Sequence, residues 1–165
     1  LGLKSYFDLQ EDVEVVLSEM AEQVAIRLRR RHKKTKLISI YIGFSKYEMK
    51  SSLHCQEAID PSNQTAVLTK AVLQLFRKKY HSGAVRQIGV RYSDLVDDKY
   101  SIISLFDDPI LMEKEEKLQQ AIDGIRDEFG FLSIQKGTSL LESSRNIARS
   151  KLIGGHSAGG LEGLQ

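Results

Sequence analysis

The residues best suited to chemistry lie in an alternating stretch near the middle of the chain. Between residues 87 and 93, apolar side chains alternate strictly with polar or very small ones. This period of two is typical of a strand with one buried and one solvent-facing side. The solvent-facing side would carry Gln87, Gly89, Arg91 and Ser93. Because a glycine flanked by cationic and hydroxyl groups lets the backbone approach an extended anion, a nucleic acid is the leading candidate ligand.

Two clusters of cations bear on this expectation. Residues 27–36 hold seven lysines and arginines in ten positions, and Arg77, Lys78, Lys79 and His81 form a second group. Each cluster can contact phosphates, or it can simply complement the dipole at the C-terminal end of a helix. If the two helices run in the same direction over the sheet, both basic ends lie at one edge, which favours binding.

No catalytic constellation stands out. The paired carboxylates Asp97-Asp98 and Asp107-Asp108 occur where aspartates commonly cap helices and make turns. The four histidines have no metal-ligand spacing, and no serine lies in the context of a nucleophile. We therefore predict no catalytic residue, no metal site and no cofactor in this chain.

Composition places the chain among soluble globular proteins. Its 165 residues suit one domain with an appendage, and 41% hydrophobic residues with a net charge of +2 are ordinary values. A single cysteine, Cys55, excludes a disulfide framework and fits a reducing compartment, so we expect a cytoplasmic protein. No apolar run is long enough to span a membrane. Because the chain begins at Leu1 without a methionine, we expect a piece of a longer protein.

Helical and strand periodicities alternate along the chain. They predict a helix over 10–32, strands over 37–45 and 49–58, a helix opened by Asp60-Pro61, a strand over 85–93, and a helix from Asp108-Pro109 to Gly130. Residues 1–7 would form a short first strand. The prediction is an α+β fold: a βαββαβ two-layer sandwich with two helices on one face of an antiparallel sheet, plus an extra C-terminal helix.

The second face of this sheet is expected to stay open. Strand alternation adds further candidate contacts to it: Ser39, Tyr41, Gly43, Lys50, Ser52 and His54. We place the sheet domain at 1–96, a linker at 97–107, the extra helix at 108–130 and a partly flexible tail at 131–165.

The stretch Arg86-Gln87-Ile88-Gly89-Val90-Arg91-Tyr92-Ser93 resembles the last strand of the little-finger domain of Y-family DNA polymerases, the translesion enzymes. The predicted order of elements fits that domain. The segment 103–108, followed by the helix 118–130, resembles the tail of the UV-damage-repair branch of the family. The resemblance extends over about residues 10 to 150.

The resemblance implies a function. The little finger holds the template-primer duplex in its major groove through the open sheet face, mostly by backbone and phosphate contacts. By position, the contacts would come from Arg86, Gln87, Gly89, Arg91 and Ser93. The chain would then be the C-terminal region of a bacterial polymerase that acts in DNA damage repair and the SOS response. The catalytic palm is absent from this fragment, so the polymerase reaction and its Mg²⁺ would belong to the parent protein.

Relatives also bind the sliding clamp through a short peptide, and the matching positions here are Ile102, Ile103, Ser104, Leu105 and Phe106. The usual glutamine is absent, but Leu105 and Phe106 can fill an apolar pocket. The alternative is that these two residues pack against the domain itself.

Two other functions compete with this interpretation. A free-standing RNA-binding module would stack bases on aromatic residues of the open face, where only Tyr41 is predicted. A small-molecule enzyme of ferredoxin-like fold would need a catalytic constellation. The oligomeric state stays open, because the apolar stripe over 111–129 can pack on the sheet domain or on another copy.

Overall fold

The computed structural model describes residues 10–99, 106–147, 152–153 and 156–157. The chain divides into two units, residues 1–102 and 103–165. Each unit is built by different means, the first around a sheet and the second around a long helix.

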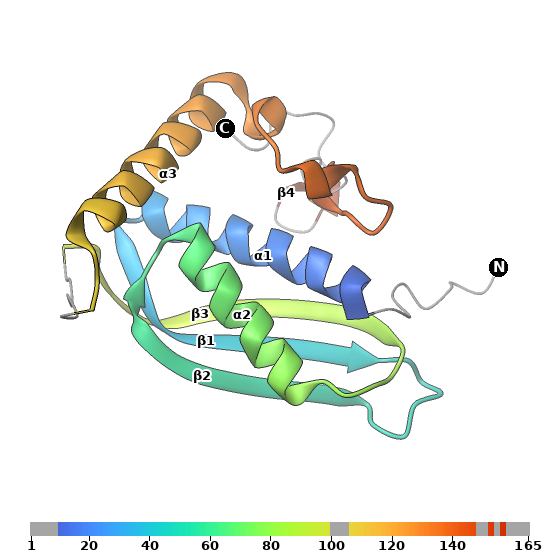
Figure 1. Ribbon diagram of the computed structural model, residues 1–165. Coiled ribbons are helices and arrows are strands. Elements are labelled where there is room, and N and C mark those ends of the chain that lie inside the picture. The colour runs from blue at the N-terminus through green and yellow to red at the C-terminus, as the bar shows by residue number, and fades with distance from the viewer. Residues whose placement is uncertain (1–9, 100–105, 148–151, 154–155, 158–165) are drawn as a thin grey trace. The chain divides into compact units, whose positions relative to one another are not determined.

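The first unit is a three-stranded antiparallel sheet covered on one face by two helices (Figure 1). Its elements are α1 (Gln10–Arg30), β1 (Lys33–Phe44), β2 (Ser52–Ser62), α2 (Thr65–Lys79) and β3 (Val85–Asp97). β1 lies in the centre, with β2 and β3 on either side. The predicted α+β class and its helices on one face are confirmed. The first strand predicted for residues 1–7 lies outside the described residues.

The core lies between the sheet and the helices. The alternating apolar residues of β1 face the helices, and the apolar stripes of α1 and α2 face the sheet, as the periods of strand and helix require. Its fully buried members include Val13, Leu17, Ala21, Ile42, Leu68, Val72, Phe76 and Val85. Cys55 lies half-buried at the same interface, where burial raises the pKa of its thiol. It is an ordinary strand cysteine, as predicted.

The two helices run antiparallel to each other. Arg77, in the last turn of α2, forms a two-pronged ion pair with Glu14 near the start of α1, with N–O distances of 2.9 and 2.7 Å. At the other end of the pair, Arg29 of α1 donates to Asn63 O at 2.7 Å and Thr65 Oγ1 at 3.0 Å, where α2 begins. The basic ends of the two helices therefore lie at opposite ends of the sheet. The expectation that they share one edge is wrong, because it required parallel helices.

The start of α2 differs from the prediction. Asp60 and Pro61 do not open the helix; they lie in β2, and α2 begins at Thr65. The strand continues because Ser62 still pairs with Thr35 after a shift of register. Proline, which has no backbone N–H, is tolerated there because β2 is an edge strand of the three-stranded sheet. The outer side of β2 has no neighbouring strand in this sheet to which an N–H would donate.

The second unit is organised by α3 (Pro109–Phe129). Its start is confirmed, since the Asp108 carboxylate accepts hydrogen bonds from the backbone N–H groups of Ile110 and Leu111. Its end is also confirmed, because Gly130 takes a φ of 97°, a conformation that suits glycine. Shorter elements follow it: η1 (Phe131–Ser133), η2 (Gly137–Leu140), β4 (Leu152–Ile153) and β5 (His156–Ser157).

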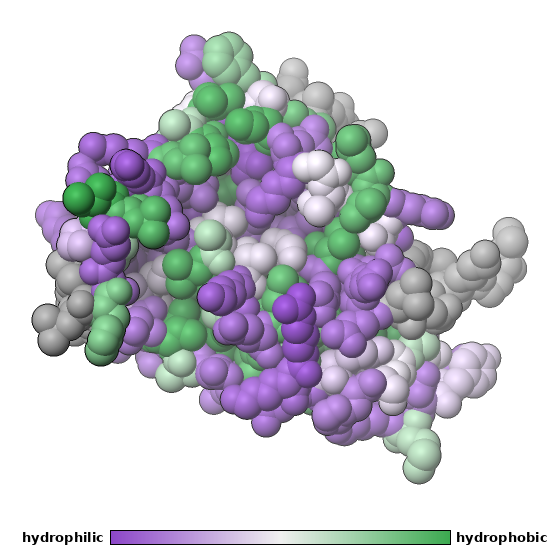
Figure 2. Space-filling model, in the orientation of Figure 1, coloured by the Kyte–Doolittle hydropathy of each residue, from purple (hydrophilic) through white to green (hydrophobic). Residues whose placement is uncertain are grey.

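The apolar stripe of α3 is largely exposed. Leu118 is 62% exposed and Phe129 69% exposed, and Figure 2 shows hydrophobic side chains gathered along this helix. The buried residue of α3 is instead Arg126, whose guanidinium donates to Ile134 O and lies 4.7 Å from the centre of the Phe131 ring. None of the described helices combines the length and apolar character that crossing a bilayer requires.

Candidate nucleic-acid interface

The sheet face turned away from α1 and α2 is a regular grid of side chains, which we call the open face. Strand pairing aligns its residues in rows across β2, β1 and β3. The rows are Ser52–Gly43–Gln87, His54–Tyr41–Gly89, Gln56–Ser39–Arg91 and Ala58–Leu37–Ser93. The pairing thus brings most of the predicted contact residues together on one surface.

Two rings occupy the middle of the open face. The centroids of Tyr41 and His54 are 4.5 Å apart, with their planes tilted by 55°. The Tyr41 hydroxyl donates to Gln87 Oε1 at 3.2 Å, which ties the ring toward the next row of the grid. The Tyr41 side chain therefore lies along the surface of the sheet, in contact with His54 of β2 and Gln87 of β3.

The two glycines of the open face differ in the space that surrounds them. A Cβ atom at Gly43 would lie 2.9 Å from the Gln87 Cβ and 3.0 Å from the Tyr41 hydroxyl. A Cβ at Gly89 would lie 3.4 Å from the Tyr41 Cβ, an ordinary contact. Gly43 is thus required by its neighbours, whereas Gly89 has room for a small side chain beside Tyr41.

A shallow hollow of about 480 Å³ lies on the open face. Its polar lining comes mainly from the third row of the grid, Gln56, Ser39 and Arg91, together with Tyr41 and His54. The hollow offers a cation, hydroxyls, an amide and two rings to whatever lies on the sheet. Gln56 was not among the predicted contacts, although its alternation with His54 places it on the same face.

Two predicted contact residues lie off the grid. β3 carries one extra residue where Gly43 pairs with Gln87 and Phe44 with Val85, so Arg86 sits at a register shift, exposed to solvent. Lys50 belongs to the loop before β2 and lines a different hollow, beside Phe44 and Tyr80. Both residues stay predictions for DNA contact, but strand alternation does not place them on the open face.

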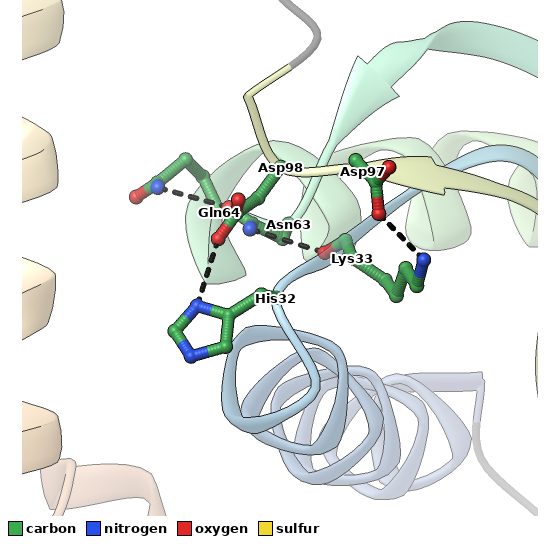
Figure 3. A network of polar contacts seen from close by, with 6 residues as sticks. All are labelled: His32, Lys33, Asn63, Gln64, Asp97 and Asp98. Carbon is green, nitrogen blue, oxygen red and sulfur yellow. Dashed lines mark hydrogen bonds and ion pairs between the residues drawn. The ribbon is translucent and has the colours of Figure 1, made fainter.

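Part of the first basic cluster takes part in a polar network at the ends of β1 and β3 (Figure 3). Lys33 pairs with Asp97 at 2.6 Å, which lowers the pKa of that carboxyl mainly through the hydrogen bond between them. His32 Nδ1 lies 3.1 Å from Asp98 Oδ2, and the Asp98 N–H donates to His32 O. Asn63 Nδ2 donates to Lys33 O at 3.1 Å, which joins this network to the start of α2.

This network gives a structural role to Asp97 and Asp98, one of the two pairs of adjacent aspartates in the sequence. Asp97 and Asp98 close the end of β3 against the start of β1, a role that depends on strand pairing and was not predicted. Within the described residues, no group of three or more histidine, cysteine, aspartate or glutamate side chains is arranged to hold a metal ion.

The candidate clamp peptide falls mostly outside the described residues, which include only its last member, Phe106. That side chain is exposed, next to Asp107 and the N-terminal cap of α3.

Comparison with known proteins assigns the chain to a family. The model of the impB/mucB/samB family C-terminal domain matches residues 3–105, which include the three-stranded sheet and both helices that cover it. The chain belongs to this family. The resemblance to the C-terminal domain of Y-family DNA polymerases is thereby confirmed.

Relatives extend the similarity beyond the sheet unit. The putative UV-damage repair protein UvrX of Bacillus subtilis is 35% identical over 147 residues, which are 88% of this chain and 35% of that protein. DNA polymerase IV 2 of Halalkalibacterium halodurans is 29% identical over 147 residues, again 88% and 35% of the two chains. DNA polymerase IV of Acetivibrio thermocellus is 32% identical over 139 residues, 82% and 34%. The chain spans about a third of the length of these relatives.

Proposed function

We propose that this chain binds duplex DNA through the open face, without reading the base sequence. It does so as the C-terminal region of an error-prone translesion polymerase in DNA damage repair. The family and the names of its relatives, which include a UV-damage repair protein and DNA polymerases, support this role.

The observation that carries the proposal is the row Gln56–Ser39–Arg91 beside the shallow hollow. An exposed guanidinium, a hydroxyl and an amide are the donors that proteins direct at phosphate and sugar oxygens. Such contacts fix the position of a duplex but carry no sequence information, which suits an enzyme that must follow damaged templates. Because Gly89 lines the hollow and has no side chain, a phosphate would be able to come close to the backbone of β3 there.

A single-stranded nucleic acid is the second candidate. The contact between Tyr41 and His54 favours it, because two adjacent rings form a platform on which bases can stack. The hydrogen bond from Tyr41 to Gln87 weighs against it, since it holds the ring along the sheet.

Fluorescence anisotropy with labelled duplex and single-stranded oligonucleotides over a series of salt concentrations tests the proposal. We expect tighter binding of the duplex. Arg91→Ala should weaken duplex binding and lower the slope of log K against log salt by about one, the loss of one phosphate contact. The matched control is Lys70→Ala, which removes an exposed cation from α2 and should leave both quantities unchanged. An unaltered slope in Arg91→Ala, or preference for the single strand, would contradict the proposal.

The same family membership supports a wider role as well. The polymerase reaction and its Mg²⁺ would belong to a catalytic part of the longer protein, which acts in the cytoplasm at the nucleoid during the SOS response. Residues 102–106 would contact the sliding clamp through Leu105 and Phe106. Pull-down of the clamp by the chain, and its loss in the double variant Leu105→Ala/Phe106→Ala, tests this part separately.

A further inference from the structure

A second hollow lies at the end of α2, on the side of the sheet that the helices cover. Its volume is about 300 Å³, and we call it the α2-end hollow. Its apolar lining comes from Phe44, Leu53 and Tyr80, with Met49 at its exposed margin. The rings of Phe44 and Tyr80 stack with centroids 6.3 Å apart, and the Tyr80 hydroxyl donates to Gly83 O at 2.9 Å. These rings therefore form a fixed apolar floor.

Two cations flank this floor. Lys50 and Lys79 line the hollow together with His81, all three are exposed, and neither lysine forms an ion pair with a carboxylate of the described residues. The acidic residue of the lining, Glu48, is already engaged, because its carboxylate accepts the Ala84 N–H at 2.8 Å. The two lysines outnumber this one carboxylate, so the rim of the hollow carries a net positive charge.

The loop between β1 and β2, residues 45–51, projects beyond the ends of these two strands (Figure 1). Its residues Glu48, Met49 and Lys50 line the hollow. The loop exposes two large hydrophobic residues that the core does not use, Met49 completely and Tyr47 at 85%. Backbone hydrogen bonds still hold the loop in place, from Phe44 N to Ser51 O and from Ser45 N to Ala84 O. Exposed apolar residues on a held loop are typical of a surface that contacts another protein.

We propose that the α2-end hollow docks an acidic segment of a partner protein, with one large apolar side chain inserted between Phe44, Leu53 and Tyr80. The volume suits one or two side chains and lies at the lower limit for small-molecule sites. An apolar floor matches a side chain, whereas a phosphate backbone would gain only from the cations. Since the hollow and the open face lie on opposite sides of the sheet, the chain can hold the partner and DNA together.

Anisotropy of a fluorescein-labelled peptide tests this proposal on the whole chain. The probe has one phenylalanine flanked on each side by two glutamates, and the control peptides replace the phenylalanine by alanine or the glutamates by lysines. We expect the probe to bind with a Kd of about 1 mM or lower and both control peptides to bind at least about tenfold more weakly. Equal binding of the alanine peptide, or no binding of the probe, would overturn the proposal.

Variants locate the binding site. The double variant Lys50→Glu/Lys79→Glu should bind the probe about tenfold more weakly, since it reverses two charges at the rim of the hollow. The matched control, Lys70→Glu, alters the same helix away from the hollow and should bind normally. Arg91→Glu should also bind normally and separates the hollow from the open face. If Arg91→Glu bound the probe more weakly, or if saturating duplex DNA displaced the peptide completely, the peptide would occupy the open face where DNA is proposed to bind. Either result would refute the docking site and leave the proposed DNA binding intact.

Discussion

At the scale of single residues, the open face depends on how Tyr41 lies across it. The ring is held between His54 and Gln87, and the two glycines beside it are constrained to different degrees. Gly43 has a side chain on each side of the position that a Cβ would take, whereas Gly89 faces the tyrosine at an ordinary distance. Glycine is therefore needed for packing at Gly43 but not at Gly89, where we propose that it lets the duplex approach the backbone.

This difference predicts contrasting results for two alanine substitutions. Gly43→Ala should lower the free energy of unfolding by about 1–3 kcal/mol, the usual cost of overpacking, because the Gln87 Cβ cannot move without its strand. Gly89→Ala should leave the unfolding free energy nearly unchanged but weaken duplex binding, since its methyl group occupies the approach to the backbone. Urea denaturation followed by circular dichroism measures the first effect and anisotropy the second. Equal destabilisation by both variants would refute this assignment.

The rows of the open face were predictable, and their details were not. The period of two in β1 and β3 places Ser39, Tyr41 and Arg91 on one side without any knowledge of the fold. The position of Arg86 depends on an extra residue in β3 opposite β1. The contact of Tyr41 with Gln87 likewise joins residues 46 positions apart. Such features arise from pairing between distant segments, which local patterns do not encode.

At the scale of elements, α1 and α2 are fastened to each other at both ends. The pair of Arg77 with Glu14 lowers the pKa of the Glu14 carboxyl, chiefly through their hydrogen bonds and against the opposing effect of burial. A carboxyl whose pKa is lower in the folded state stabilises the fold above its unfolded pKa, and this contribution is lost as the pH falls through the folded value.

Glu14→Gln should therefore destabilise the protein in a pH-dependent manner. The difference in unfolding free energy between the wild type and this variant should be greatest near neutral pH. It should shrink below about pH 4, where the carboxyl gains its proton. Urea denaturation at several pH values measures the difference. A difference that stays constant across this range would show that the ion pair does not contribute as inferred.

β3 is joined to α1 by a buried hydrogen bond, in which the Tyr92 hydroxyl donates to Ala21 O at 3.1 Å. Burial also raises the pKa of this hydroxyl above its ordinary value, so it stays protonated. Tyr92→Phe removes the donor and little volume, and should lower the unfolding free energy by about 1 kcal/mol. Chemical denaturation tests this; an equally stable variant would argue against a structural role for the bond.

The helices were the most predictable elements, because their apolar stripes recur over several turns. Asp60-Pro61 misled the assignment of α2, since a proline suits the first turn of a helix as well as an edge strand. Only the pairing of Ser62 with Thr35 decides between them. The direction of α1 relative to α2 could not be predicted either, because it follows from the path of the chain through β1 and β2.

At the scale of the whole molecule, the described hydrophobic core belongs to the first unit. Its buried members run from Val13 to Tyr92, and none of them comes from the described part of residues 103–165. A fragment of residues 1–102 should therefore unfold cooperatively and bind duplex DNA as tightly as the whole chain. Thermal denaturation and anisotropy measure the two properties. A fragment that is unfolded, or that binds at least tenfold more weakly, would contradict this division.

The most direct test of the account is to map the duplex onto the sheet by nuclear magnetic resonance. Titration of the isotope-labelled chain with duplex DNA should shift the amide signals of Ser39, Tyr41, His54, Gly89 and Arg91. The signals of the solvent side of α2, around Lys70 and Gln74, should stay in place. Shifts concentrated on α2, with an undisturbed open face, would contradict the central claim that DNA lies along this sheet.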